Sequence, residues 1–167
     1  MKRPSTISEW LVVTIGTAFG LGLAPIAPGS FGALLGAGLH GVVWLKYPDS
    51  VRPILIGIFF GVCLIHTIMT SAAVRFWEDS DPKNFVLDEV AGYLLVAVIA
   101  SGWVTPTLIM IEGYLLFRIL DIIKPPPARQ IDENMHTAMG VLLDDLVAAC
   151  YASVILLAQN WLIQFYF

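Results

Sequence analysis

The sequence predicts an all-α membrane protein, a compact bundle of several membrane-spanning helices with a site facing the cytoplasm. Of its 167 residues, 57% are apolar and only 13% are charged, whereas soluble domains carry about 25% charged and about 45–50% apolar residues. The apolar residues come in long blocks, as expected for helices that cross a bilayer. The length allows one domain over residues 1–167.

Three apolar runs occupy the first half of the chain. Residues 10–24 form a run that is somewhat short for a span of about 20 residues, whereas residues 54–74 are long enough to cross. Residues 31–45 lie between them and are rich in glycine and alanine, which let helices approach closely in lipid. We therefore expect a helix from each run.

The second half contains two further runs. Residues 90–119 are too long for one helix, and Ser101-Gly102 with Pro106 predicts a turn in the middle. Each resulting arm has about 15 residues, or about 22 Å, which is shorter than the bilayer core. These arms could be tilted, re-entrant or packed inside the bundle. Residues 141–167 form the last crossing, and their aromatic end suits a membrane interface.

Basic residues predict the orientation. If runs 31–45 and 54–74 form one hairpin and the two arms of 90–119 a second, Lys46 and Arg52 lie on one side of the membrane. The opposite side then holds Lys2, Arg3, Arg75, Lys83, Arg118, Lys124 and Arg129. Because basic residues concentrate on the cytoplasmic side of membrane proteins, this majority side is predicted to be cytoplasmic.

Several classes of protein are excluded. Nine basic against thirteen acidic residues, with no basic stripe, argue against nucleic acid as a partner. Cys63 and Cys150 stand alone in apolar runs, so neither a disulfide framework nor a CxxC metal site is predicted. The oligomeric state stays open, because the small residues of the 31–45 run suit packing within or between subunits.

Two acidic pairs, Asp88-Glu89 and Asp144-Asp145, predict a metal site. Acids near helix N-termini can simply stabilise the helix by about 0.3–1 kcal/mol. Each pair, however, is followed directly by apolar sequence, and carboxylates at membrane depth are costly and usually functional. If the pairs converge, a divalent cation would relieve their repulsion. Oxygen ligands alone favour Mg²⁺ or Mn²⁺ over Zn²⁺.

A phosphate-binding group is predicted nearby. Arg118, Asp121 and Lys124 are spaced i, i+3, i+6 along one helix face, and Pro125 ends that helix. The two cations could be snorkelling side chains at a helix end. Alternatively, Arg118 forks onto phosphate oxygens and Lys124 adds a point charge. Asp121 is then either a further metal ligand or the partner that orients Arg118.

Two weaker candidates complete the site. The Gly/Pro-rich segment 20–32 could be a tight turn, or its backbone at Gly29 and the Ser30 hydroxyl could bind an anion where the next helix starts. His136 lies in a polar segment before Asp144 and could donate a proton to a leaving group. His40 and His66 stand in apolar runs and are predicted to be packed, hydrogen-bonded core residues.

These features together predict metal-dependent phosphotransfer or phosphohydrolysis on a lipid headgroup, with access from the cytoplasm. A small cation-coupled transporter is the alternative of a different class. Its acids should be spread across the membrane depth, whereas here they cluster on one predicted face and alternate with phosphate-type cations.

Four blocks of sequence resemble the phosphatidylglycerophosphatase A family. They are GLGLAPIAPGSFGALLG (20–36), VLDEVAGYLL (86–95), FRILDIIKPPPARQID (117–132) and NMHTAMGVLLDDLVAA (134–149). The resemblance implies an all-helical, Mg²⁺-dependent inner-membrane hydrolase. Its phospholipid substrate would be phosphatidylglycerophosphate, whose terminal phosphate it removes to leave phosphatidylglycerol in phospholipid biosynthesis. A phosphatase for another membrane lipid phosphate stays open.

Metal-assisted hydrolysis of a phosphomonoester is the leading hypothesis for the candidate residues. Asp88, Glu89, Asp144 and Asp145 would hold one or two Mg²⁺ ions, and these four with Asp121 would be the catalytic acids. Arg118 and Lys124 would stabilise charge on the phosphate, with attack either by water or through an aspartyl-phosphate.

Overall fold

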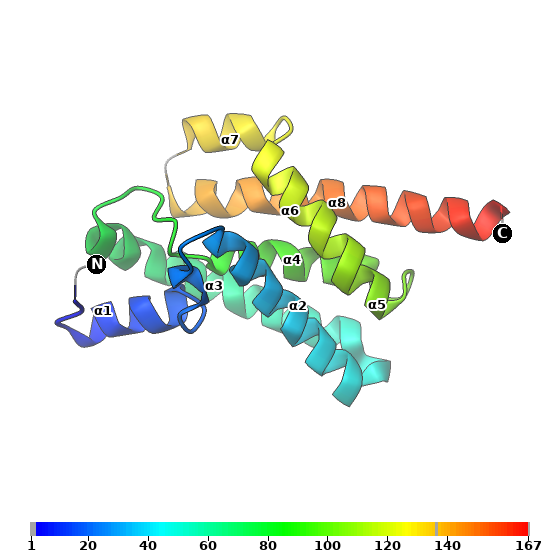
Figure 1. The fold of residues 1–167 in the computed structure, drawn as a ribbon, viewed down its shortest axis with the longest axis horizontal. Helices are drawn as coiled ribbons and strands as arrows, with labels where there is room; N and C mark the ends of the chain where they lie inside the picture. The colour runs from blue at the N-terminus through cyan, green and yellow to red at the C-terminus, as the bar shows by residue number, and fades with distance from the viewer. Residues whose placement is uncertain (1–2, 136, 167) are drawn as a thin grey trace.

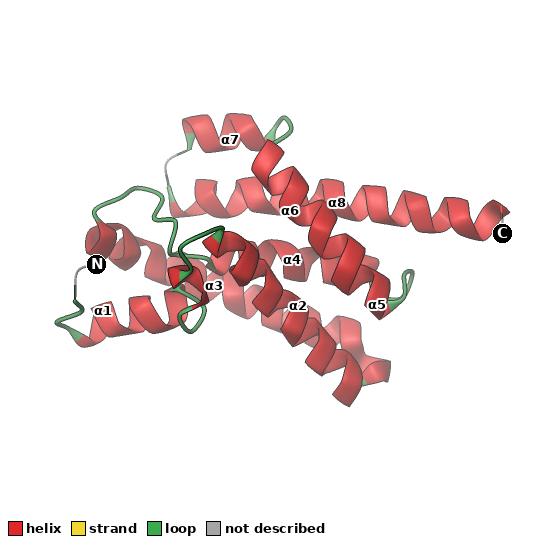
Figure 2. Cartoon of the chain, in the orientation of Figure 1, coloured by secondary structure: helices red, strands yellow, loops and turns green. Residues whose placement is uncertain are grey.

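Helices make up most of the computed structural model, which describes residues 3–135 and 137–166 (Figures 1 and 2). In chain order they are α1 (Ile7–Leu11), α2 (Pro28–Lys46), α3 (Val51–Trp77), α4 (Leu87–Ala100), α5 (Pro106–Leu108), α6 (Tyr114–Ile123), α7 (Ala128–Asn134) and α8 (Ala138–Tyr166). Within the described residues no strand is formed, so the predicted all-α class is confirmed.

Helix α4 is the centre of the fold. It packs against α2, α3 and α8, and side chains on all its faces are buried, including Tyr93, Leu94 and Val96. A helix that is apolar all round belongs in a core. Its 14 residues span about 21 Å, so of the three arrangements left open by the sequence, this arm is packed inside the bundle.

The long run 90–119 divides where the sequence predicts. Helix α4 ends at Ala100, and a turn follows in which Gly102 has φ +87°, a conformation that favours glycine. Helix then resumes at Pro106 and continues to Ile123 through α5, a π-helical turn (Ile109–Gly113) and α6. The predicted turn is therefore confirmed.

The first apolar run does not form a single helix. Helix α1 continues as a π-helical turn (Val12–Gly16), and then Ala18, Phe19 and Gly20 all have positive φ. A short 3₁₀ turn (Leu21–Leu23) follows before α2 starts at Pro28. Three consecutive residues with positive φ cannot continue a right-handed helix, so the expectation of one helix over 10–24 is wrong.

Two helical segments are long and apolar enough to cross a membrane. Residues Pro48–Trp77 and Ala138–Tyr166 each contain an 18-residue stretch of high mean hydropathy, 2.1 and 2.0 respectively. On α3, Ile56, Phe60, Leu64 and Ile68 recur every four residues and are exposed, as expected for a face that contacts lipid. The aromatic end of α8 extends beyond the other helices (Figure 1). The protein is membrane-associated, and further crossings stay a prediction.

The two ends of α4 differ in charge. At its C-terminus, Arg52 donates hydrogen bonds to the carbonyls of Val98 and Ile99, at 3.1 Å each. These bonds satisfy carbonyls that a helix end leaves free. At its N-terminus lie Asp88 and Glu89. The acidic pair and Arg52 therefore lie at opposite ends of the central helix.

The two core histidines differ from each other. Both are fully buried, as predicted. His40 Nδ1 lies 3.1 Å from the Tyr93 hydroxyl, which confirms a hydrogen-bonded core residue. Neither ring nitrogen of His66 has a hydrogen-bond partner in the described chain, and the ring packs on Phe85 at 5.2 Å between centroids. The predicted hydrogen bond is wrong for His66.

Candidate active site

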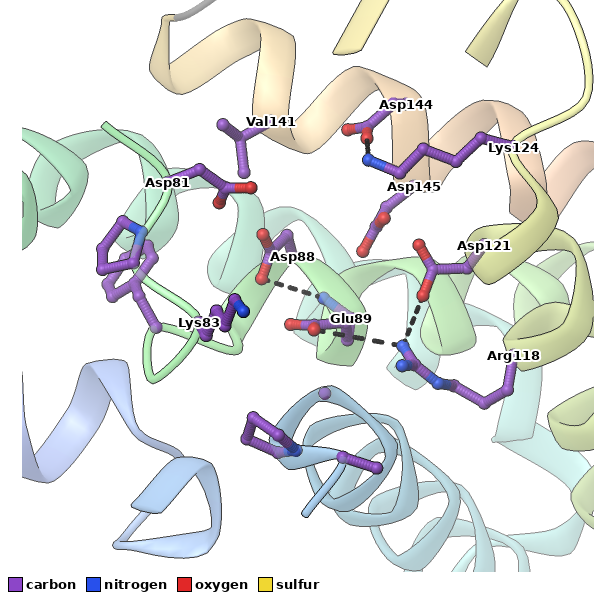
Figure 3. A pocket seen from close by; sticks show the side chains of 15 residues that line it. Asp81, Lys83, Asp88, Glu89, Arg118, Asp121, Lys124, Val141, Asp144 and Asp145 are labelled. Atoms are coloured by element: carbon purple, nitrogen blue, oxygen red, sulfur yellow. Dashed lines mark hydrogen bonds and ion pairs between the residues drawn. The ribbon is translucent and has the colours of Figure 1, made fainter. Parts of the chain in front are cut away.

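One cavity of about 230 Å³ collects most of the predicted site residues (Figure 3). It opens where the starts of α2 and α4, the end of α6 and the first part of α8 meet the loop before α4. The lining residues are Ala27, Pro28, Gly29, Asp81, Pro82, Lys83, Phe85, Asp88, Glu89, Arg118, Asp121, Lys124, Val141, Asp144 and Asp145. We call this space the carboxylate cavity.

Three carboxylates in this cavity are close enough to share a cation. One carboxylate oxygen from each of Asp88, Glu89 and Asp145 lies within 4.8 Å of the others. Asp88 and Asp145 are only 6% and 5% exposed. Glu89 Oε2 and Asp145 Oδ2 are buried without a hydrogen-bond partner in the described chain. Such oxygens are costly to bury unless a positive charge satisfies them, so this group fits a divalent cation with oxygen ligands.

Local structure explains how these acids come together. Asp88 and Glu89 lie in the first turn of α4, where the helix dipole favours negative charge, and Asp88 Oδ1 accepts a hydrogen bond from the Glu89 amide at 3.1 Å. Asp145 lies two turns into α8, which packs along α4. The close contact of these two helices therefore places Asp145 beside the pair on α4.

Arg118 joins the acids of two helices. Its Nη1 lies 2.6 Å from Asp121 Oδ2, one turn further along α6, and 3.9 Å from Glu89 Oε1 on α4. The Arg118 side chain is 12% exposed, and its Nε makes no hydrogen bond within the described chain. The ion pair agrees with a role for Asp121 in orienting Arg118, and both roles predicted for Asp121 stay predictions. Arg118 keeps donors available for a phosphate.

Lys124 is held between two carboxylates. It caps α6 with a left-handed backbone (φ +49°), and its Nζ lies 2.6 Å from Asp144 Oδ2 and 2.7 Å from Asp132 Oδ1. Burial lowers the pKa of Lys124, but hydrogen bonds to Asp132 and Asp144 outweigh burial and raise the pKa above its ordinary value. The ammonium group therefore stays charged at neutral pH.

Asp144 lies in the carboxylate cavity but is not one of the three clustered carboxylates. Its Oδ2 contacts Lys124, while its buried Oδ1 has no hydrogen-bond partner in the described chain. In this arrangement Asp144 holds Lys124. Its role as a metal ligand stays a prediction.

The two residues predicted to bind an anion at the start of α2 differ in their position relative to the carboxylate cavity. Gly29 lines the cavity, and a Cβ at this position would overlap Glu89 Oε1 and lie 3.0 Å from Arg118 Nη2. Because Gly29 has no side chain, the Glu89 carboxylate and the Arg118 guanidinium can lie close to its backbone. Ser30 is not among the lining residues, and its carbonyl accepts a hydrogen bond from the Tyr114 hydroxyl at 3.3 Å. His136 lies outside the described residues.

Sequence reasoning missed two charged residues of the cavity. Asp81 and Lys83 come from the loop between α3 and α4 and face the acidic group (Figure 3). Their one signal in the sequence is position, because a cation and an acid stand shortly before Asp88-Glu89.

Comparisons with known proteins agree on one family. The family model described as phosphatidylglycerophosphatase A matches residues 14–160. Phosphatidylglycerophosphatase A of Escherichia coli is 32% identical over 165 residues, covering 96% of this chain and 90% of the relative. The protein of the same name from Haemophilus influenzae is 31% identical, covering 98% and 96%. A putative phosphatidylinositol-3-phosphatase of Bacteroides thetaiotaomicron is also 31% identical, covering 98% and 99%. No solved structure matches.

Proposed function

This chain belongs to the phosphatidylglycerophosphatase A family, and from that premise we propose that it is a Mg²⁺-dependent phosphatase of the membrane lipid phosphatidylglycerophosphate. The reaction would release the terminal phosphate and leave phosphatidylglycerol, a step of phospholipid biosynthesis. The observation that carries the proposal is the group of three carboxylates beside Arg118, of which Asp88 and Asp145 are buried and Glu89 is half-buried. It combines a cation site with a phosphate-binding side chain in one cavity.

The metal site would consist of Asp88, Glu89 and Asp145, and Asp144 would add a further ligand. A bound Mg²⁺ would activate water and neutralise phosphate oxygens. The carboxylates are held in place by the core itself, since α4 and α8 form its most extensive contact. Such preorganised ligands need little rearrangement when a cation enters.

Arg118 and Lys124 would act on the phosphate. Arg118 forms an ion pair with Asp121, and its Nε has no hydrogen-bond partner in the described chain, so it would bind phosphate oxygens and stabilise the charge that develops on them. Lys124 would exchange part of its contact with Asp132 for the phosphate, because Asp132 is the more exposed of its two partners, at 41% against 4% for Asp144.

The hydrolysis would follow one of two routes, and the overall reaction is the same in both. In the first, a water oxygen bonds to phosphorus while the bond from phosphorus to the glycerol oxygen breaks. In the second, a carboxylate of the cavity attacks first and water then hydrolyses the aspartyl-phosphate. In both forms the leaving glycerol oxygen takes up a proton, and His136 is the candidate donor from the sequence.

We place the protein in the bacterial inner membrane as a multi-pass protein with the carboxylate cavity facing the cytoplasm. The excess of basic residues predicted on that side supports this orientation. The cavity lies at the end of α4 opposite Arg52, one of the two basic residues assigned to the other side.

A second substrate has one specific observation in its favour. The Bacteroides relative is named a putative phosphatidylinositol-3-phosphatase and covers 98% of the chain at nearly the same identity as the other relatives. A different lipid phosphomonoester is therefore the alternative substrate. The transporter alternative has less support, because the acids of the carboxylate cavity gather at one end of the bundle instead of along a path through it.

The experiment measures phosphate release by the purified full chain in detergent–lipid micelles. Phosphatidylglycerophosphate, phosphatidylinositol 3-phosphate and phosphatidate are compared, each with Mg²⁺ and with a chelator. The proposal expects the highest kcat/KM for phosphatidylglycerophosphate and loss of turnover with chelator. A preference for phosphatidylinositol 3-phosphate would show that this lipid is the substrate instead. Full turnover in chelator would refute the proposed dependence on Mg²⁺. Ion flux in liposomes without phosphate release would favour the transporter.

A further inference from the structure

A second cavity adjoins the carboxylate cavity. It has a volume of about 250 Å³ and is lined by Trp77, Asp79, Pro82, Lys83 and Asn84. Pro82 and Lys83 line both spaces, so the two cavities meet at this part of the loop between α3 and α4. We call the second space the loop cavity. None of the residues predicted from the sequence to form the site lines it.

Lys83 differs from the other two cations of the carboxylate cavity, because it has no ion-pair partner among the described residues. Arg118 is paired with Asp121, and Lys124 with Asp132 and Asp144. Among the residues that the structure describes, Lys83 makes no ion pair or hydrogen bond, and its side chain is exposed. Its ammonium group can therefore bind an anion without first giving up a carboxylate.

The loop that carries Lys83 is fixed at several points. Asn84 Nδ2 donates a hydrogen bond to the Gly22 carbonyl at 2.7 Å, and the Val86 amide donates one to the Gly16 carbonyl at 2.9 Å. Pro82 is buried, and its carbonyl accepts a hydrogen bond from the Phe85 amide at 2.8 Å. Lys83 thus extends from an anchored backbone, which limits where its charge can lie.

The segment bonded to this loop exposes apolar side chains. Phe19 is 77% exposed, and Leu21 and Leu23 flank the very Gly22 whose carbonyl binds Asn84. Exposed apolar side chains next to polar cavities suit a molecule with an acyl part and a charged headgroup. A phospholipid entering from this side would reach Lys83 before its terminal phosphate reached the carboxylates.

We propose that the loop cavity is a subsite for the phosphodiester of the lipid substrate and that Lys83 binds this diester. The inference rests on the proposed function, because phosphatidylglycerophosphate carries two phosphates, of which one reacts and the other does not. The terminal monoester is the group that reacts in the carboxylate cavity. The diester keeps one negative charge throughout the reaction, and a cation that binds it equally in the ground and transition states lowers KM without changing kcat.

The test uses the full chain in detergent–lipid micelles with Mg²⁺ and phosphatidylglycerophosphate as substrate. Lys83→Gln removes the charge, Lys83→Arg keeps it, and Lys46→Gln is the matched control at the exposed end of α2. Two soluble competitors probe the subsites separately. Glycerophosphoglycerol carries a diester and no monoester, and inorganic phosphate probes the carboxylate cavity.

Lys83→Gln is expected to raise KM about tenfold with kcat within about twofold of the wild type, as for loss of one charge-assisted hydrogen bond. The inhibition constant of glycerophosphoglycerol should rise by the same factor, while that of inorganic phosphate stays constant. Lys83→Arg should restore both values. Unchanged constants in Lys83→Gln, or an equal change for both competitors, would overturn the subsite. A wild type that releases no phosphate would instead overturn the proposed function and this inference with it.

Discussion

Lys124 Nζ lies 2.6 Å from Asp144 Oδ2 and so connects the end of α6 to α8. The pair is unequal in exposure, because the Asp144 side chain is 4% exposed and the Lys124 side chain 27%. Removing the lysine would leave a carboxylate in a site that water hardly reaches. The contact therefore contributes both to the site and to the stability of the bundle.

We expect Lys124→Met to destabilise the protein by about 1–3 kcal/mol, the cost of leaving a buried polar group without its partner. Asp132→Asn should cost less than about 1 kcal/mol, because Asp132 is 41% exposed. Unfolding in detergent followed by circular dichroism measures both. Combining Lys124→Met with Asp144→Asn should recover much of the loss, and a double variant as unstable as the sum of its parts would contradict this account.

The Lys124 contribution should be constant around neutral pH. Because the pKa of Lys124 is raised in the folded protein, its stabilisation is fully present below the unfolded-state pKa of about 10.4 and is lost as the pH rises through the folded-state value. The stability difference between wild type and Lys124→Met should therefore stay level from about pH 7 to about pH 9. A difference that falls steadily over this range would argue against a charged lysine.

Gly29 and Gly38 offer a matched test within α2. A Cβ at Gly29 would overlap Glu89 Oε1, whereas a Cβ at Gly38 has nothing within 4 Å. Gly29→Ala should lower kcat/KM by about 10–100-fold, since displaced site groups typically cost that much. Gly38→Ala should keep full activity and slightly raise stability, because alanine favours a helix. Equal activity in the two variants would show that the tight approach at Gly29 is unimportant.

The three clustered carboxylates should be essential for turnover. Glu89→Gln and Asp145→Asn each remove a charge from the proposed metal site, and we expect at least about a 100-fold loss in kcat. Asp49→Asn, in the exposed turn before α3, is the control and should behave as the wild type. Near wild-type turnover in either site variant would remove that residue from the metal site.

Mg²⁺ should stabilise the folded protein independently of activity. A cation that binds only the folded state adds about 2.7 kcal/mol at 100 times its Kd, and it would relieve the repulsion among Asp88, Glu89 and Asp145. The measurement is the midpoint of thermal unfolding with Mg²⁺ and with chelator. Asp145→Asn should lose most of the shift, while a shift of the wild-type size in this variant would place the cation elsewhere.

The helices and the acidic pairs were predictable because their signals are local. Ser101-Gly102 and Pro106 marked the break in the run 90–119, and the i, i+3 spacing placed Arg118 next to Asp121. Lys124 was grouped with Arg118 on one helix face. In the structure Lys124 leaves the helix through a left-handed cap and contacts α8 instead.

The rest depended on contacts that the sequence does not encode locally. Hydropathy alone could not show that α4 would be surrounded by three other helices. Asp81 and Lys83 lie in a loop without periodicity, and only the return of the chain from α3 brings them to the cavity. The apolar run 10–24 suggested a helix, but the positive φ values of Ala18 and Phe19 break it.

The π-helical turn at Ile109–Gly113 determines which way Arg118 faces. Such a turn accommodates about one residue more than an α-helical turn. If the same residues formed a regular α-helix, everything after Gly113 would rotate by about 100°, the angle between successive residues. Arg118 would then point away from Glu89. Deleting exposed Ile111 should therefore convert the turn to α-helix and leave activity intact, whereas inserting a residue beside it should abolish turnover.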